Sequence, residues 1–180
     1  MTSATLSSLL IIMFSAATDI LRLVAVRGGG VLIGIKNYLM STTISVPGCE
    51  RLEQVIVRTS LGFHSIYICG NYLRPNSDPE LYTAHSNAIH KGLNMANPAD
   101  TVVVLGDYNL PHLCWSLDHD LNSYIPVNAS SEQETVMCES VMSNGLQQIN
   151  SISNINGRIL DLVFVNNGTR LTCSNRQRIS

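Results

Sequence analysis

Short runs of apolar and β-branched residues, separated by turns, recur along this chain of 180 residues. Residues 31–36 form one such run directly after three glycines, which predicts a strand that is entered from a turn. Residues 53–59 alternate between polar and apolar positions, and a run at 64–70 follows a short turn at 60–62, so an antiparallel hairpin is expected. Residues 101–106 predict a fully apolar strand, the form expected of one that is buried on both faces.

A helix is predicted after this hairpin. Ser77 or Asp78 is expected to cap its start, because Pro79 then occupies the first helical position, and the helix is expected to run to about Ala96. Its apolar face is expected to consist of residues at helical spacing: Leu81, Ala84, Ala88, Gly92, Leu93 and Ala96.

The second half of the chain predicts one more helix and one more strand. A loop is expected over 107–119, a helix over 132–144 and a last strand over 159–165. Strands that alternate with helices in this way predict a mixed α/β or α+β layered domain with at least one sheet.

The amino terminus resembles the end of a secretory signal peptide, because an apolar run at 9–14 is followed by small residues. No Lys or Arg precedes this run, and Asp19 and Arg22 place charges soon after it, so the features of a signal peptide are incomplete. A membrane-spanning helix needs about 20 apolar residues, and no stretch of the sequence reaches that length. We therefore expect a short buried helix or strand here, with a cleaved signal as the alternative, and no membrane partner.

Composition narrows the class of protein. Apolar residues make up 45% of the chain and charged residues 13%, and such a sequence is too hydrophobic to be disordered. The formal net charge of -2 excludes a broad basic field, so any contact with phosphates must be local. The cysteines are widely spaced and form no C-x-x-C pair, which favours reduced thiols in an intracellular protein: Cys49, Cys69, Cys114, Cys138 and Cys173.

The strongest chemical signal comes directly after the predicted strand at 101–106. Asp107 and Asn109 are two residues apart, so on an extended chain their side chains share a face at the carboxyl end of the strand. An aspartate there can bind a hard cation such as Mg²⁺ or accept a proton from water, and an amide can donate a hydrogen bond to a phosphate oxygen. The alternative is an Asx turn, because Gly, Asp and Asn commonly form turns.

Two further segments carry polar groups at or within predicted strands. Tyr72 and Arg74 end the strand at 64–70 and offer a phenol and a guanidinium, the side chain best shaped for two contacts to a phosphate. Asp161 lies within an apolar run, where an unpaired carboxylate is costly, so it needs a partner such as a histidine or a metal. The alternative for Asp161 is an exposed position at the end of a strand.

Together these segments resemble the endonuclease/exonuclease/phosphatase superfamily, and more narrowly the apurinic-type endonuclease domain of non-LTR retrotransposons of the LINE and jockey kind. The resemblance covers about residues 27–165 and rests on the segments 27–33, 71–75, 106–109 and 159–164, together with Trp115. It implies a four-layered α/β sandwich, incomplete in this chain, and Mg²⁺- or Mn²⁺-dependent hydrolysis of a DNA phosphodiester. It also implies DNA as a partner, a nuclear location and a parent protein fused to a reverse transcriptase.

The resemblance implies a role for individual residues. Asp107 corresponds to the acid that orients or deprotonates the attacking water and is the candidate metal ligand. Asn109 corresponds to an amide that contacts the phosphate, and Tyr72 to a tyrosine that approaches the scissile phosphate. Asp161 corresponds to an aspartate that orients the catalytic histidine.

Arg74 and Asn71, in the same segment as Tyr72, are the candidate substrate-binding residues. The expected organisation is a divergent apolar segment at 1–26, the endonuclease-like domain at 27–170 and a tail at 171–180.

The sequence also departs from the family pattern. Residues 1–26 lack the expected asparagine and metal-binding glutamate, and the tail at 171–180 lacks a histidine, so we expect a larger domain from which both catalytic ends are missing. Glu50 and Glu53 come after the glycine strand, in the wrong order to replace the glutamate, and are expected to be solvent-facing charges. Trp115 is expected to pack against its own loop.

These departures leave three hypotheses open. The first is an endonuclease of impaired activity. The second is a catalytically inactive remnant or binding module of the same fold. The third is a phosphatase of the same superfamily that acts on a small molecule or a lipid.

Overall fold

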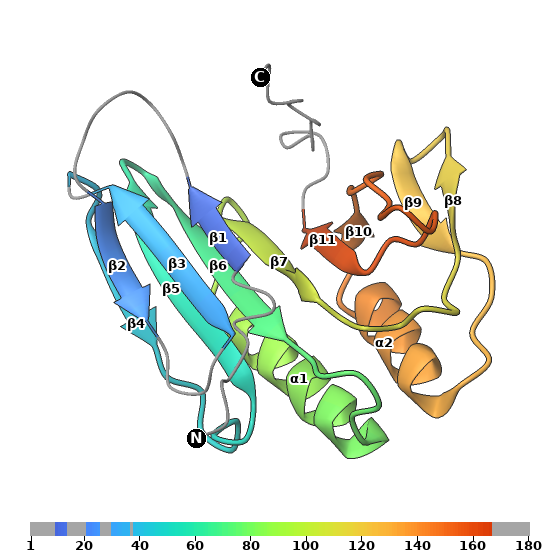
Figure 1. Cartoon of the computed structure of the whole chain (residues 1–180). Coiled ribbons are helices and arrows are strands. Elements are labelled where there is room, and N and C mark those ends of the chain that lie inside the picture. Colours follow the sequence, from blue (N-terminus) through green and yellow to red (C-terminus); the bar gives the residue numbers. More distant parts are fainter. Residues whose placement is uncertain (1–9, 14–20, 26–29, 37, 167–180) are drawn as a thin grey trace, which may run out of the picture.

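The computed structural model describes residues 10–13, 21–25, 30–36 and 38–166, which form two sheets and two helices (Figure 1). The strands are β1 (Leu10–Met13), β2 (Leu21–Ala25), β3 (Val31–Lys36), β4 (Ser41–Ile44), β5 (Glu53–Leu61), β6 (His64–Tyr72), β7 (Thr101–Asp107), β8 (Trp115–Asp118), β9 (Ser123–Pro126), β10 (Gln147–Gln148) and β11 (Asp161–Val165). The helices are α1 (Pro79–Leu93) and α2 (Glu132–Ser143).

The large sheet has eight strands in the order β4-β5-β6-β7-β11-β10-β9-β8, and the small sheet has the order β1-β3-β2. Within the large sheet only β6 and β7 pair in parallel, joined by a crossover through α1, and the other neighbouring strands are antiparallel. Figure 1 shows the small sheet lying over the β5–β6 part of the large sheet, with α1 and α2 on the opposite face. The described chain is therefore layered as small sheet, large sheet and helices.

The central strands β5, β6, β7 and β11 contribute side chains to two apolar clusters, one on each face of the large sheet, because successive side chains alternate. One face packs on β3 through Val55, Val57, Ile68, Val103, Leu105 and Val165. The other face packs on the two helices through Ile56, Tyr67, Cys69, Val102, Val104, Leu162 and Phe164. All residues from Thr101 to Gly106 are buried, so the prediction of a strand covered on both faces is confirmed.

The predicted elements are confirmed with small shifts of their ends. Strands β5 and β6 each run two residues further than predicted and form the expected hairpin, while β11 begins at Asp161 instead of residue 159. Helix α1 ends at Leu93 instead of Ala96, and Asp78 occupies its N-cap position without a side-chain hydrogen bond. Residues 10–13 form a strand, one of the two structures expected there, whereas the first two glycines before β3 lie outside the described residues.

The pattern missed four short strands and part of the helix face. Strands β4, β8, β9 and β10 have two to four residues each, too few to establish an alternation. In α1 the fully buried positions include Tyr82, His85 and Ile89, while the predicted Leu81 and Leu93 are only partly buried. The buried face of α1 is thus rotated toward Tyr82, His85 and Ile89. The polar atoms of Tyr82 and His85 form hydrogen bonds in the interior.

The expected α/β class is confirmed. In the described ranges the helices cover one face of the large sheet, and a second helical layer on the small sheet is not among them. None of the described helices is long and apolar enough to cross a membrane. The described cysteines Cys49, Cys69, Cys114 and Cys138 are free thiols, and burial raises the pKa of the Cys69 thiol to about 12.

Two glycine-to-alanine substitutions test this packing in opposite directions. A Cβ on Gly106 would lie 2.0 Å from the backbone oxygen of Asn71, whereas one on Gly92 in α1 would meet only Ile56 Cδ1 at 3.9 Å. We expect Gly106→Ala to lower the free energy of unfolding by about 3 kcal/mol or more, because the backbones of β6 and β7 must separate. We expect Gly92→Ala to raise it by up to about 1 kcal/mol, the helix propensity difference. Urea denaturation measures both, and a stable Gly106→Ala protein would contradict the β6–β7 register.

Candidate active site

Four polar side chains stand side by side across the large sheet where β6 and β7 end. Glu53 on β5 pairs with Tyr72 on β6, Tyr72 pairs with Asp107 on β7, and Asp107 pairs with Asp161 on β11. Directly paired residues point to the same face of a sheet, and Tyr72 packs against the cluster under β3. Glu53, Tyr72, Asp107 and Asp161, here called the polar row, therefore lie on the small-sheet face at the carboxyl ends of β6 and β7, where the two arrowheads of Figure 1 meet.

The ends of β6 and β7 are fastened together at Leu73. Its N–H donates to the backbone oxygen of Asp107 at 2.9 Å, and its carbonyl accepts from Asn109 Nδ2 at 2.8 Å. Leu73 is also fully buried, 1% exposed. This double link continues the strand pairing by one residue beyond Tyr72 and holds the row in place.

Asp107 and Asn109 also form the Asx turn that was one interpretation of this segment. Asp107 Oδ1 accepts the backbone N–H of Asn109 at 3.0 Å, and Asn109 has a positive φ of 48°, a conformation that asparagine tolerates. The turn uses the backbone N–H of Asn109, while the Asn109 side-chain amide donates to the Leu73 carbonyl and lies close enough to Asp107 to lower its pKa. The turn therefore fixes both side chains at the end of β7.

The two neighbouring aspartates are desolvated. Burial raises the pKa of Asp107, the negative charge of Asp161 raises it further, and hydrogen bonds from Asn109 oppose both effects. Although Asp161 lies at the surface, partial burial of its carboxylate raises its pKa as well. Its backbone oxygen accepts from Asn150 Nδ2 at 2.6 Å, but its carboxylate makes no hydrogen bond within the described part of the chain. Such a pair of carboxylates attracts a proton or a cation.

The polar row offers carboxylates, the type of ligand that a magnesium ion prefers, although fewer ligands than its full coordination needs. Mg²⁺ is commonly bound through one or two carboxylates, with waters and substrate phosphates completing its coordination, and Asp107 and Asp161 offer two carboxylates on adjacent strands. The residues that the structure describes contain no group of three or more His, Cys, Asp or Glu side chains placed to hold a metal. Asp107 and Asp161 are therefore the candidate ligands.

Glu53 is the site residue that the sequence interpretation missed. It was expected to face solvent, but its side chain is only 15% exposed and it accepts from Arg74 Nε at 2.8 Å and from the neighbouring Nη2. Arg74 itself is 71% exposed. The signal that would have revealed Glu53 is its cross-strand position opposite Tyr72, which is known once the hairpin register is known.

Asn71 is not brought to the row. It neighbours Tyr72 in β6 and therefore faces the helices, where it is 1% exposed. Its amide has no hydrogen-bond partner of normal geometry among the described residues. Burial raises the pKa of the nearby Tyr108 hydroxyl, and the Asn71 amide opposes this only in part. The structure thus places Asn71 in the interior, away from any surface where a substrate would bind.

A buried polar cluster lies beneath α1, on the helix side of the sheet. His85 is fully buried, with Nδ1 2.8 Å from Gln54 Oε1 and Nε2 3.1 Å from the Tyr108 hydroxyl. Because an amide oxygen only accepts, Nδ1 carries the proton and Nε2 accepts from Tyr108. Tyr82 completes the cluster by donating to the Tyr108 carbonyl at 2.6 Å. His85 is therefore a structural residue, and burial lowers its pKa to about 4.

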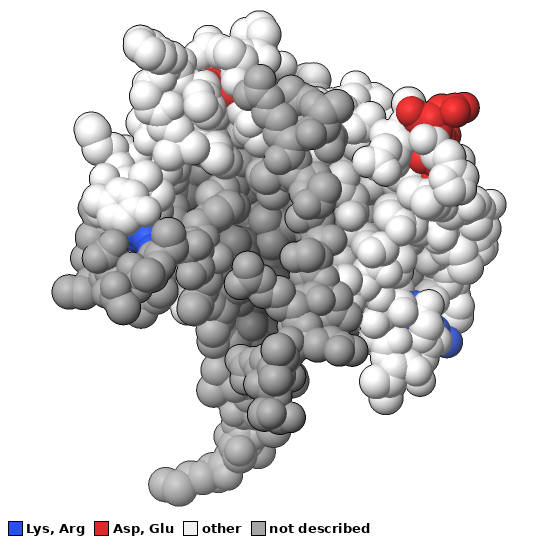
Figure 2. All heavy atoms as spheres, turned by 90° about the horizontal axis from the view of Figure 1, so that it is seen from above, with Lys and Arg blue, Asp and Glu red and all other residues white. Residues whose placement is uncertain are grey.

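Trp115 is a packing residue, but it lies on β8 and packs against β11 instead of only against its own loop. Its ring lies 6.0 Å from that of Phe164, and the residue is partly buried against the helix-side cluster. On the face seen from above, the described residues expose mainly uncharged atoms, with isolated Lys and Arg and with most of the visible acidic atoms at one margin (Figure 2). This view agrees with the expectation that any phosphate contact is local.

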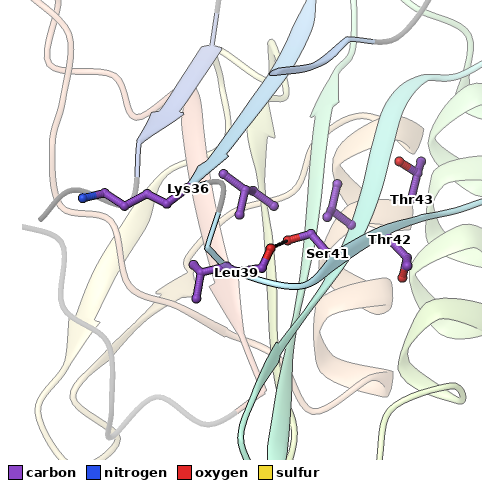
Figure 3. Close-up of a pocket in the computed structure, with 7 residues that line it drawn as sticks. Lys36, Leu39, Ser41, Thr42 and Thr43 are labelled. Carbon is purple, nitrogen blue, oxygen red and sulfur yellow. Dashed lines mark hydrogen bonds between the residues drawn. The ribbon is translucent and has the colours of Figure 1, made fainter. Parts of the chain in front are cut away.

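A separate cavity of about 440 Å³ lies at the far end of β3 from the polar row. Figure 3 shows hydroxyl groups of Ser41, Thr42 and Thr43 around it, while the Lys36 side chain extends away from them. The Lys36 ammonium lies 5.9 Å from the centre of the Tyr38 ring, a cation–π distance. This cavity shares no residue with the polar row.

Neither the protein-family models nor the curated proteins give a match to this sequence. Among solved structures, the chain is similar to the endonuclease domain of TRAS1, a telomere-specific non-LTR retrotransposon, with a TM-score of 0.51 and 16% identity over 80% of this chain and 66% of that domain. The chain has the endonuclease/exonuclease/phosphatase fold. The resemblance seen in the sequence is thereby confirmed at the level of the fold.

Two further solved structures of this fold match more remotely. Humanized D. rerio TDP2 has a TM-score of 0.36 and 12% identity over 75% of this chain and 51% of its own. An endonuclease/exonuclease/phosphatase family protein from Leptotrichia buccalis has a TM-score of 0.33 and 16% identity over 63% of this chain and 42% of its own. The chain thus spans about two thirds of the TRAS1 domain and about half or less of the other two.

The neutral state of His85 predicts a loss of stability in acid. Its pKa is about 4 in the folded chain and about 6.5 when unfolded, so between these values the unfolded chain binds more protons. The free energy of unfolding should therefore fall as the pH drops from about 6.5 to about 4, by about 3 kcal/mol from this group. Urea denaturation at pH 7.0 and pH 4.5 measures the loss, which should be smaller in His85→Gln. NMR shifts of the His85 ring that titrate near pH 6.5 in the folded protein would contradict the prediction.

Proposed function

We propose that this chain is a metal-dependent nuclease domain that hydrolyses phosphodiester bonds in DNA. The observation that carries the proposal is the adjacency of Asp107 and Asp161 beside Tyr72, at the end of the one parallel strand pair of the large sheet. The fold supports the proposal, because the similar TRAS1 structure is described as an endonuclease domain. Mg²⁺ or Mn²⁺ is the proposed cofactor, with Asp107 and Asp161 as its protein ligands.

The polar row and Asn109 offer several of the groups that such a hydrolysis uses. Water attacks the phosphorus atom, the bond from phosphorus to the leaving oxygen breaks, the attacking water loses a proton, and the leaving oxygen takes up a proton from solvent. The Asp107 carboxylate is proposed to orient that water and accept the proton. Tyr72 and the Asn109 side-chain amide are proposed to donate hydrogen bonds to phosphate oxygens as charge builds on them. A cation held by Asp107 and Asp161 would neutralise charge on the phosphate.

A second candidate function is DNA binding without cleavage. It is favoured by Asp161, whose carboxylate has no histidine partner in the part of the chain that the structure describes. In this case the fold and Arg74 would retain affinity for DNA, while no group would complete the catalytic set. The fusion of the parent protein to a reverse transcriptase is part of the proposal under either function.

A plasmid-nicking assay tests the first function. We expect the chain to convert supercoiled plasmid to the nicked form with Mg²⁺ but not with EDTA. Asp107→Ala should slow nicking at least ~100-fold, the usual contribution of a positioned acid or base. Asp161→Asn should also slow it and should shift the Mg²⁺ dependence to higher concentration, because one proposed ligand is lost.

Glu139→Ala is the matched control, since Glu139 is an exposed acid on α2 that belongs to no described hydrogen bond. It should nick like the unmodified chain. Nicking that survives Asp107→Ala would refute the site, and DNA binding without nicking in every protein would favour the second function. Release of phosphate from small phosphomonoesters instead of nicking would favour a phosphatase.

A further inference from the structure

We infer that Glu53 is a positioning residue whose carboxylate holds the Arg74 guanidinium ready for a phosphate of the substrate backbone. The inference rests on the proposed function, because it names a further group that the same site uses. Neither the sequence pattern nor the resemblance assigns a role to Glu53.

The geometry of the pair leaves the guanidinium open to a second partner. One oxygen of Glu53 accepts from both Nε and Nη2 of Arg74. An arginine has five N–H groups, so the remaining ones stay available. The carboxylate is 15% exposed and the guanidinium 71% exposed, so the pair turns its positive end outward. A planar guanidinium held in this way can donate two parallel hydrogen bonds to a phosphate.

The backbone of Arg74 is fixed independently of its side chain. Leu73, the preceding residue, is hydrogen-bonded at both its N–H and its carbonyl. The Arg74 carbonyl accepts from Ser77 Oγ at 2.8 Å and from the Ser77 N–H at 3.2 Å. The rotamers of the Arg74 side chain are then its main conformational freedom, and the hydrogen bonds to Glu53 restrict them.

Glu53 is itself held in place by packing. A Cβ on Gly30, just before β3, would lie 3.0 Å from Glu53 Oε2 and 3.0 Å from Tyr72 Cδ1. The start of β3 therefore lies directly over Glu53 and Tyr72, and a side chain at position 30 would crowd both. Because the pair is largely open on the arginine side, it contributes little to stability. Its geometry is better explained by binding than by folding.

Charge-matched variants separate positioning from simple electrostatics. Glu53→Gln removes a negative charge, and by charge alone it should tighten DNA binding. If Glu53 positions Arg74, the same change should weaken binding. Glu50→Gln removes the same charge at an exposed position three residues earlier, where the carboxylate accepts the nearby Gly48 N–H at 3.1 Å, and so supplies the electrostatic baseline.

Affinity is measured by fluorescence anisotropy on a labelled DNA duplex with Ca²⁺ in place of Mg²⁺, and KM and kcat by nicking with Mg²⁺. We expect Arg74→Ala to raise Kd and KM about tenfold, the worth of a charge-assisted hydrogen bond. Glu53→Gln should raise both about threefold, Glu50→Gln should raise neither, and kcat should change less than about twofold in all three. In the Arg74→Ala background, Glu53→Gln should behave like Glu50→Gln, because no guanidinium is left to position.

The outcomes separate the inference from the proposed function. Wild-type binding and nicking, with Glu53→Gln equal to or tighter than Glu50→Gln, would overturn the positioning role and leave the nuclease proposal intact. A wild-type chain that neither binds nor nicks DNA would overturn both. Thermal unfolding of each variant is the folding check, and Glu53→Asp, a shorter carboxylate, should recover part of the affinity lost in Glu53→Gln.

Discussion

The polar row depends on the register of β6 against β7, because these strands come from distant parts of the chain and nothing else brings Tyr72 level with Asp107. The parallel pairing is continued beyond Tyr72 by the two hydrogen bonds of Leu73, and it is permitted by Gly106, whose missing side chain lets the backbone of Asn71 approach. Asp161 then joins from β11 by antiparallel pairing with Asp107. A slip of β6 by one residue would turn Tyr72, the row member on this strand, to the helix side.

The same sheet carries polar groups on both faces, and desolvation acts on them with opposite results. On the helix face, burial keeps His85 neutral, and a neutral imidazole finds one acceptor and one donor, so the cluster is satisfied. On the small-sheet face, burial raises the pKa of Asp107 and Asp161, and no described cation offsets their charge. The hydrogen bonds of His85 are therefore complete, whereas the carboxylates of the polar row keep unused capacity for a proton, a cation or a substrate.

The sequence predicted the elements better than the site. Asp107 and Asp161 were found because each interrupts or ends an apolar run, a signal contained within one strand. The role of Glu53 depends on its pairing across a hairpin, and the register of such a pairing cannot be derived from the sequence of one strand alone. Asn71 and Tyr72 were both assigned to the substrate, although neighbours in a strand must point to opposite faces. That alternation was available from the sequence and would have excluded one of the two.

The charges of the polar row also explain why binding of a phosphate by Arg74 would depend on the proposed cation. With all groups ionised, Glu53, Asp107 and Asp161 bring three negative charges and Arg74 one positive charge, so the row repels a phosphate. A divalent cation at Asp107 and Asp161 would bring these groups together with Arg74 to neutrality, and the outward guanidinium would then supply a local positive field. Under the proposed function, a chain with a net charge of -2 would in this way attract a DNA backbone at one point of its surface without a basic face.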